Sequence, residues 1–301
     1  VATDSTSVNL FKVLSAALHL QQEDAPSRRV VLSERSNFPT DLYIAEALCR
    51  ERGCTLKLVE PHEIFAALTD EVAALMATQR LVNLARETGK RIHVLHVSTR
   101  QEMEFLRDHK DVASVEVTPH HLTLTHEEVA FGATGEHDRI AYNTNAKVNP
   151  PLRTAADVDA VRAGLEDGTI DIVATDHAPH PHEDKDCEWA AAAMGMLGLE
   201  TALSVVIETM VDTNRLTWRQ VADRMSVNPA RIGRVADHGQ AIAVGAPANL
   251  TIVDANARWI VDPMQLASKS RNTPYAARAM RGKVVATFLR GRATVLEGKL
   301  V

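Results

Sequence analysis

The stretch Ile170-Asp-Ile-Val-Ala-Thr-Asp-His-Ala-Pro-His180 joins a short apolar strand to a carboxylate and two imidazoles. In parallel α/β folds, the groups that carry chemistry follow the carboxyl ends of the strands. Ionisable groups this dense are costly to bury unless they have partners or a metal ion. A carboxylate in this place can ligate Zn²⁺ and exchange a proton with water. The stretch therefore indicates a parallel α/β protein in which Asp176 serves a metal-dependent site.

A second strand end, Arg91-Ile-His-Val-Leu-His-Val-Ser-Thr99, carries two more histidines. Side chains alternate along a strand, so His93 and His96, three residues apart, face opposite sides and cannot both ligate one ion unless the strand bends. His96 is the better candidate ligand because it lies at the end of the strand. For either histidine, a hydrogen-bonded core position is the simpler interpretation of this feature alone.

Two further motifs are less specific. In Lys147-Val-Asn-Pro-Pro-Leu-Arg153 the consecutive prolines hold the backbone extended, which would fix Asn149 and Arg153 for a substrate carboxylate or ring amide. A rigid surface turn with a solvated arginine fits this spacing equally well. The histidines of Thr118-Pro-His-His-Leu122 could simply cap a strand end, with Glu116 as a neighbour that supports them.

The remaining hydrophobic pattern alternates between β and α periodicity. It predicts strands over 29–33, 55–59, 91–96, 113–117 and 170–174, and helices over 8–20, 40–50, 71–87, 101–110 and 155–165. Short connections between such units imply parallel strands with right-handed crossovers. Helices are predicted from residue 194 onward, followed by short strands over 249–253, 257–261, 283–289 and 293–296 that form a small antiparallel unit. The irregular stretch 125–147 is predicted to be a loop.

Composition limits the class of partner. The net charge is −6 without a basic stripe, which argues against binding to nucleic acid or to an anionic membrane and favours a small molecule. No apolar run approaches the roughly 20 residues that span a bilayer. The three cysteines form no ligand-spaced cluster, and this pattern favours a reducing cytoplasm over a disulfide scaffold.

Taken in order, several motifs resemble dihydroorotase of the long bacterial class, in the amidohydrolase superfamily, over residues 62–301. They are HVLHVST, EVTPHHL, VNPPLR, ATDHAPH, GMLGLETALS, SVNPAR, PANLTIVD and FLRGR. The resemblance implies an α/β fold, a (β/α)₈-type barrel over 62–245 that is incomplete at its N-terminal side, and a small antiparallel β unit over 246–301. It also implies Zn²⁺ and the reversible hydrolysis of dihydroorotate to carbamoyl aspartate in pyrimidine biosynthesis. The implied protein partners are a second copy of the chain or aspartate transcarbamoylase.

The same resemblance assigns roles to individual residues. His96 is similar to a zinc ligand at the end of strand six, and Asp176 to the strand-eight ligand that is also the general acid or base. The implied substrate-binding positions are Asn149, His180 and the backbone around Met196 and Gly198. The family's His-x-His, substrate arginine and further metal ligands have no counterpart, so two candidate ligands stand where a catalytic zinc needs three.

Residues 1–61 resemble a segment of kynureninase, a pyridoxal-phosphate enzyme. In that segment, Ser5 and Thr6 would hold the cofactor phosphate, Phe38 would stack on its ring and Asp41 would contact it. The family's Schiff-base lysine segment has no counterpart, so a β-α-β unit that fills structural space is the simpler interpretation. Two resemblances joined near residues 60–62 suggest a chimera, a designed or generated sequence, or a spliced sequence.

The sequence leaves three functions open. The first is a dihydroorotase-like hydrolase, which most of the chain resembles. The second is a catalytically inactive dihydroorotase-like scaffold, which the missing His-x-His favours on chemical grounds. The third is a pyridoxal-phosphate enzyme related to kynureninase, which ranks last because the lysine segment is absent.

Overall fold

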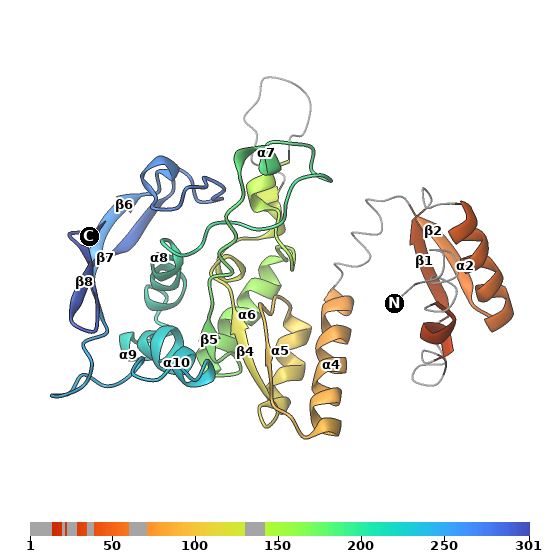
Figure 1. The fold of residues 1–301 in the computed structure, drawn as a ribbon, viewed down its shortest axis with the longest axis horizontal. Helices are drawn as coiled ribbons and strands as arrows, with labels where there is room; N and C mark the ends of the chain where they lie inside the picture. Colours follow the sequence, from red (N-terminus) through yellow and green to blue (C-terminus); the bar gives the residue numbers. More distant parts are fainter. Residues whose placement is uncertain (1–13, 20–21, 23–28, 35–38, 60–70, 130–141) are drawn as a thin grey trace, which may run out of the picture. The chain divides into compact units, whose positions relative to one another are not determined.

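The structure is a computed structural model that describes residues 14–19, 22, 29–34, 39–59, 71–129 and 142–301 (Figure 1). The chain divides into two compact units, Val1–Asp70 and Glu71–Val301. Among the helices of the described ranges, none combines the length and apolarity needed to cross a membrane. The sequence-based domain division at 61/62 and 245/246 stays a prediction.

The first unit contains one β-α-β element. Its parts are β1 (Val30–Glu34), α2 (Pro39–Arg52) and β2 (Thr55–Val59). The two strands pair in parallel, and α2 buries Leu48 and Cys49. The helix ends at Arg52, and the next residue, Gly53, has a φ of 64°, which glycine adopts easily. The predicted strand, helix and strand are thereby confirmed.

Several residues of the kynureninase resemblance lie outside the described residues. These are Ser5, Thr6 and Phe38, together with the junction at 60–62. Asp41 lies on α2. The resemblance of this segment stays a prediction.

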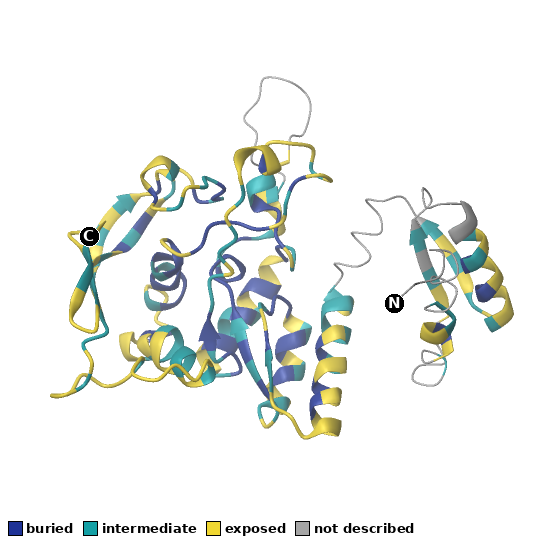
Figure 2. Ribbon diagram, in the orientation of Figure 1, coloured by how far each residue is buried: buried dark blue, intermediate teal, exposed yellow. Residues whose placement is uncertain are grey.

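The second unit begins with three parallel strands and the helices between them. The elements are α4 (Glu71–Thr88), β3 (Ile92–Val94), α5 (Arg100–Leu106), β4 (Ala113–Val117), α6 (Ala155–Asp167) and β5 (Ile172–Val173). The strand order is β3-β4-β5, and all pairs are parallel. Along β4, Ala113, Val115 and Val117 are fully buried, whereas Ser114 and Glu116 are half-buried. Figure 2 shows the ribbon coloured by burial, with both buried and half-buried parts in this sheet. One face of the sheet therefore belongs to the apolar core, and the other carries polar side chains.

Capping boxes set where α5 and α6 begin. The hydroxyl of Thr99 accepts from the backbone N–H of Glu102, whose carboxylate accepts from the backbone of Thr99 in return. Thr154 and Asp157 make the same exchange at α6. Each cap contributes about 1 kcal/mol. The first cap ends the segment that carries His96, and the second directly follows the Pro-Pro motif, so the caps fix the chain at both motifs.

The rest of the unit is helical and then antiparallel β, as predicted. The elements are α7 (His182–Lys185), α8 (Ala202–Val206), η5 (Ile207–Val211), α9 (Trp218–Ala222), η6 (Asp223–Val227), α10 (Asn228–Ile232), β6 (Leu250–Ile260), β7 (Ala279–Leu289), β8 (Arg292–Leu296) and β9 (Lys299–Leu300). Short 3₁₀ turns are η1 (Arg107–His109), η2 (His120–Leu122), η3 (His126–Val129), η4 (Thr144–Ala146) and η7 (Pro263–Gln265). The prediction of two strands over 249–253 and 257–261 is wrong, because β6 continues through Asp254–Arg258 by shifting its register against β7.

Gly282 is where β7 packs most closely on the helices. Its carbonyl accepts from the hydroxyl of Ser204 and the indole N–H of Trp259, at 2.9 and 3.0 Å. A Cβ on Gly282 would lie 2.2 Å from Cδ1 of Ile207, and its φ is 86°. The β unit therefore approaches η5 at a distance that only glycine allows.

We expect Gly282→Ala to lower the free energy of unfolding by about 2 to 4 kcal/mol, from backbone strain together with overpacking. Gly245→Ala is the matched control, since Gly245 has a φ of 87° and nothing within 4 Å of the added Cβ. The control should lose only about 1 kcal/mol. Urea unfolding of both variants measures the difference, and equal losses would contradict the close packing of β7 on η5.

Candidate functional site

Three adjacent parallel strands end at the same edge of the sheet, and each is followed by an ionisable side chain. His96 follows β3, His120 follows β4 and Asp176 follows β5. Parallel strands bring their carboxyl ends to one edge, where binding sites of α/β proteins form. This edge is the candidate site.

Two of these residues have backbone conformations that residues other than glycine rarely adopt. The φ angle is 36° at His96 and 48° at Asp176. Positive φ angles outside glycine are uncommon and concentrate at functional sites. His96 lies in a bend, so the strand departs from the strict alternation that placed His93 and His96 on opposite faces. The direction of the His96 side chain therefore does not follow from that of His93.

His93 belongs to a hydrogen-bonded network on the polar face of the sheet. Its Nδ1 lies 2.8 Å from Oγ of Ser114, and its Nε2 lies 2.9 Å from Oε2 of Glu116. The simpler interpretation holds for His93, which is a satisfied histidine within the sheet. Glu116 supports His93 through this contact, whereas the sequence had grouped it with the histidines that follow β4.

His120 is the site residue that sequence reasoning missed. Its side chain is 2% exposed, and its Nε2 has no hydrogen-bond partner among the described residues. Burial, His121 and His96 together hold the pKa of His120 well below its usual value, so the ring is neutral. A buried ring nitrogen without a partner costs free energy that a ligand or metal ion would offset. The signal was present in the sequence, because His120 follows a strand just as His96 and Asp176 do.

His121 connects the end of β4 to the Pro-Pro motif. Its Nε2 donates to the carbonyl of Pro150 at 3.1 Å, and its Nδ1 lies 2.7 Å from the hydroxyl of Thr118. Burial lowers the pKa of His121 to about 4, although the bond to Pro150 acts in the opposite direction. The neutral ring therefore fixes the loop that carries Asn149.

The two polar residues of the Pro-Pro motif occupy different environments. Arg153 is 8% exposed, and its Nε donates to Oγ of Ser98 at 3.2 Å. The alternative of a solvated arginine on a surface turn is therefore wrong for Arg153, which holds the chain that follows His96. Asn149 is exposed.

The segment Gly195–Gly198 lies against the residues that follow Asp176. The backbone N–H of Gly198 donates to Nδ1 of His177 at 3.1 Å, and Met196 pairs with His177 in an isolated parallel bridge. A Cβ on Gly198 would lie 2.7 Å from the carbonyl oxygen of Thr175, so glycine is required there. The structure thus places Met196 and Gly198 next to the strand end that carries Asp176.

His180 takes part in the same arrangement of loops. Its Nε2 lies 2.9 Å from the carbonyl oxygen of Met194, and its backbone N–H donates to Oδ1 of Asn272 at 3.2 Å. The amide of Asn272 donates in turn to the carbonyls of Ala178 and Gly195, at 2.9 and 3.2 Å. His180 therefore lies beside Met194 and Gly195, which directly precede Met196 in the chain, so three of the four predicted substrate positions belong to one group of neighbouring loops.

Lys185 is buried against this segment. It is 3% exposed, and its Nζ donates to the carbonyls of Ala193 and Gly195, at 2.8 and 3.0 Å. Burial, and then the charge of Lys147, lower the pKa of Lys185 to about 8. The lysine remains charged at neutral pH.

The described residues do not by themselves fit a complete zinc centre. Within the part of the chain that the structure describes, no three His, Cys, Asp or Glu side chains lie close enough together to hold a metal ion. A catalytic zinc needs at least three protein ligands. His96 lies close enough to His120 and His121 to lower the pKa of both, but among the described residues no hydrogen bond or ion pair joins His96 to Asp176.

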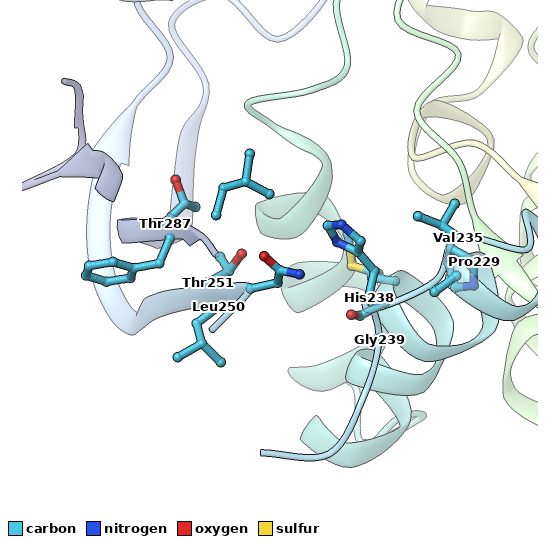
Figure 3. A pocket seen from close by; sticks show the side chains of 13 residues that line it. Pro229, Val235, His238, Gly239, Leu250, Thr251 and Thr287 are labelled. Atoms are coloured by element: carbon cyan, nitrogen blue, oxygen red, sulfur yellow. The ribbon is translucent and has the colours of Figure 1, made fainter. Parts of the chain in front are cut away.

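A separate cavity of about 390 Å³ lies between α10 and the C-terminal sheet (Figure 3). Its lining includes Pro229, Val235, His238, Gly239, Leu250, Thr251 and Thr287. No strand-end residue lines it, so it is distinct from the candidate site.

Comparison with known proteins identifies close relatives in sequence. Residues 51–294 match the family described as "Amidohydrolase family". The chain is 58% identical to the dihydroorotase of Streptomyces coelicolor over 233 residues, which cover 76% of this chain and 52% of the relative. It is 48% identical to the dihydroorotase of Mycobacterium tuberculosis over 220 residues, which cover 72% and 49%. The chain thus spans about half the length of the curated relatives it matches.

Solved structures give the same fold. The L-hydantoinase (dihydropyrimidinase) of Arthrobacter aurescens superposes with a TM-score of 0.68 at 24% identity, covering 90% of this chain and 65% of that protein. The D-hydantoinase of a Thermus species superposes with a TM-score of 0.70 at 20% identity, covering 94% and 67%. The fold class is the predicted (β/α)₈-type amidohydrolase barrel with a C-terminal β unit. Among the described residues the parallel strands form one sheet of two and one sheet of three, and the predicted incompleteness of the barrel at its N-terminal side stays a prediction.

The buried charge of Lys185 should make stability depend on pH. Its pKa is about 8 in the folded chain and 10.5 ordinarily, so between these values the unfolded chain binds more protons and stability rises with pH. Relative to Lys185→Met, wild type should gain about 2 kcal/mol between pH 7 and about pH 9.5. Urea unfolding at both pH values measures this gain, and a difference independent of pH would show that Lys185 is not desolvated.

Proposed function

The chain belongs to the amidohydrolase family, and on that premise we propose that it acts in the hydrolysis of a cyclic amide of the dihydroorotate type. The observation that carries the proposal is the placement of His96, His120 and Asp176 after three adjacent parallel strands. Identity of 44 to 58% to dihydroorotases over most of the chain supports the choice of substrate. The reaction would convert dihydroorotate to carbamoyl aspartate, and the reverse.

Enzymes of this family generally use a metal ion, and the proposal takes the ion to be zinc. His96, His120 and Asp176 supply two imidazoles and a carboxylate, which are the ligand types zinc prefers. Because the described residues do not complete a centre, the proposal assigns these three as part of a ligand set and routes no chemical step through the metal.

Asp176 is the proposed proton carrier. Opening the ring requires a bond from water oxygen to the amide carbon, cleavage of the carbon–nitrogen bond, and transfer of one proton from that water to the leaving nitrogen. Asp176 is exposed at the strand end, so its carboxylate can accept the proton from water and return it to the nitrogen. The reverse reaction uses the same group in the opposite order.

The loops around Asp176 are proposed to bind the substrate. Met196 and Gly198 would border the ring through their backbone, beside His177 and His180. Asn149 would reach the substrate from the exposed Pro-Pro turn. Self-association, or association with aspartate transcarbamoylase, belongs to the same proposal, as does a cytoplasmic location.

We expect Asp176→Asn and Asp176→Ala to lower kcat for dihydroorotate hydrolysis by about 10² to 10⁴, because each removes the group that moves the proton. Turnover is followed as formation of carbamoyl aspartate, on protein treated with a chelator and then supplied with Zn²⁺. Inductively coupled plasma analysis of the same samples gives the zinc content.

The control is Asp186→Asn, which neutralises an exposed carboxylate near His182, 3.4 Å away, outside the strand ends. It should leave kcat unchanged. Turnover by Asp176→Asn equal to that of wild type would remove Asp176 from the mechanism. A wild-type chain without turnover at any zinc concentration would contradict the proposed function of this chain.

A further inference from the structure

Two buried lysines hold one stretch of backbone by its carbonyl groups. Nζ of Lys147 donates to the carbonyls of Trp189, Ala190 and Ala192, at 2.6, 3.2 and 2.6 Å. Nζ of Lys185 donates to the carbonyls of Lys147, Ala193 and Gly195, at 3.5, 2.8 and 3.0 Å. We call Lys147 and Lys185, with the carbonyls of residues 189–195, the lysine clamp.

The clamp leaves no donor for another ligand. An ammonium group has three N–H donors, and each lysine directs its Nζ at three carbonyl oxygens. Among the described residues, neither lysine forms an ion pair with a carboxylate. The two charges therefore face backbone dipoles, and they do not form a binding site for a substrate anion.

Keeping these charges buried is costly to stability. Burial lowers the pKa of both lysines, and the charge of Lys147 lowers the pKa of Lys185 further. Each ammonium group in return supplies hydrogen bonds to carbonyl oxygens of residues 189–195, which buried backbone groups need. The free-energy cost of burying the two charges is therefore tied to the conformation of this one segment.

The clamp sets the direction of the peptide that enters the site. The carbonyl of Gly195 accepts from both Lys185 and Asn272. Since a peptide is planar and trans, fixing this carbonyl also fixes the N–H of Met196, the residue that pairs with His177. A Cβ on Gly195 would lie 2.5 Å from Cβ of Ala178, so the segment has little room to move toward the strand end.

We propose that Lys147 and Lys185 are positioning residues, which hold residues 189–195 so that Met196 and Gly198 stay against His177 and form one wall of the substrate site. The inference rests on the proposed function for its effect on substrate. It does not depend on that function for its effect on the backbone. The two effects can therefore be tested separately.

Hydrogen exchange tests the backbone effect in the full chain. In Lys185→Met and Lys147→Met, amides of residues 189–199 should exchange at least tenfold faster than in wild type, with exchange in α6 and β4 unchanged. The control is Lys110→Met, because Lys110 is also a partly buried lysine that donates to a carbonyl, that of Thr169, and pairs with Asp171. It should leave exchange of 189–199 as in wild type.

Steady-state kinetics with dihydroorotate test the effect on substrate. Both clamp variants should raise KM at least tenfold and change kcat less than threefold, because Asp176 is untouched. Lys110→Met should change neither constant. Each clamp variant removes one of the two lysines. If one variant does not fold, the other can still be compared with wild type.

Wild-type exchange of residues 189–199 in both clamp variants would overturn the proposal. So would faster exchange throughout the unit, which indicates general loosening. A fall in kcat without a change in KM would also overturn it, because the lysines would then affect the geometry of the reacting groups and not the binding of substrate. If wild type shows no turnover, the proposed function fails, and the exchange experiment alone decides the clamp.

Discussion

The parallel pairing of β3, β4 and β5 is the constraint on which the rest of the second unit depends. It brings three chain segments, separated by more than 50 residues between β4 and β5, to a common edge with His96, His120 and Asp176 following the strands. The buried face of β4 anchors this sheet on the apolar core, through Val115 and Val117. Because the strands themselves are only two to five residues long, little of the site is held by the ladder alone.

Polar side chains supply the order that the short strands lack. His121 fixes the Pro-Pro loop through Pro150, and Arg153 holds the chain after His96 through Ser98. On the other side of the site, Asn272 and Lys185 both bind the carbonyl of Gly195. In each case a buried donor meets a backbone or hydroxyl oxygen, so the polar groups satisfy one another away from water. These contacts hold irregular loops in place close to the candidate reacting groups.

Sequence periodicity was enough for the strands and helices that repeat regularly. The strand at 113–117 follows from alternation, and the helix that begins at 155 from apolar residues at helical spacing. It was not enough for β6, because a register shift after Asp254 has no signature in hydrophobic pattern. Strand-end logic found His96 and Asp176 but passed over His120, whose burial and unpaired nitrogen depend on packing between distant segments. The lysine clamp could not be predicted either. The partners of the two lysines are backbone carbonyls, which every residue has, so the sequence carries no sign of these contacts.

The hydrogen bonds of Asn272 connect the C-terminal β unit to the loops of the candidate site. Asn272 lies in the connection between β6 and β7, yet it contacts Ala178, His180 and Gly195, more than 70 residues earlier in the chain. Close packing at Gly282 holds β7 on the helices, so the connection has a fixed base from which to reach these loops. Any displacement of the β unit would therefore release the carbonyl of Gly195 from one of its two donors and leave Lys185 to hold it alone. This arrangement explains why a small antiparallel unit without a strand-end residue of its own is coupled to the geometry beside Asp176.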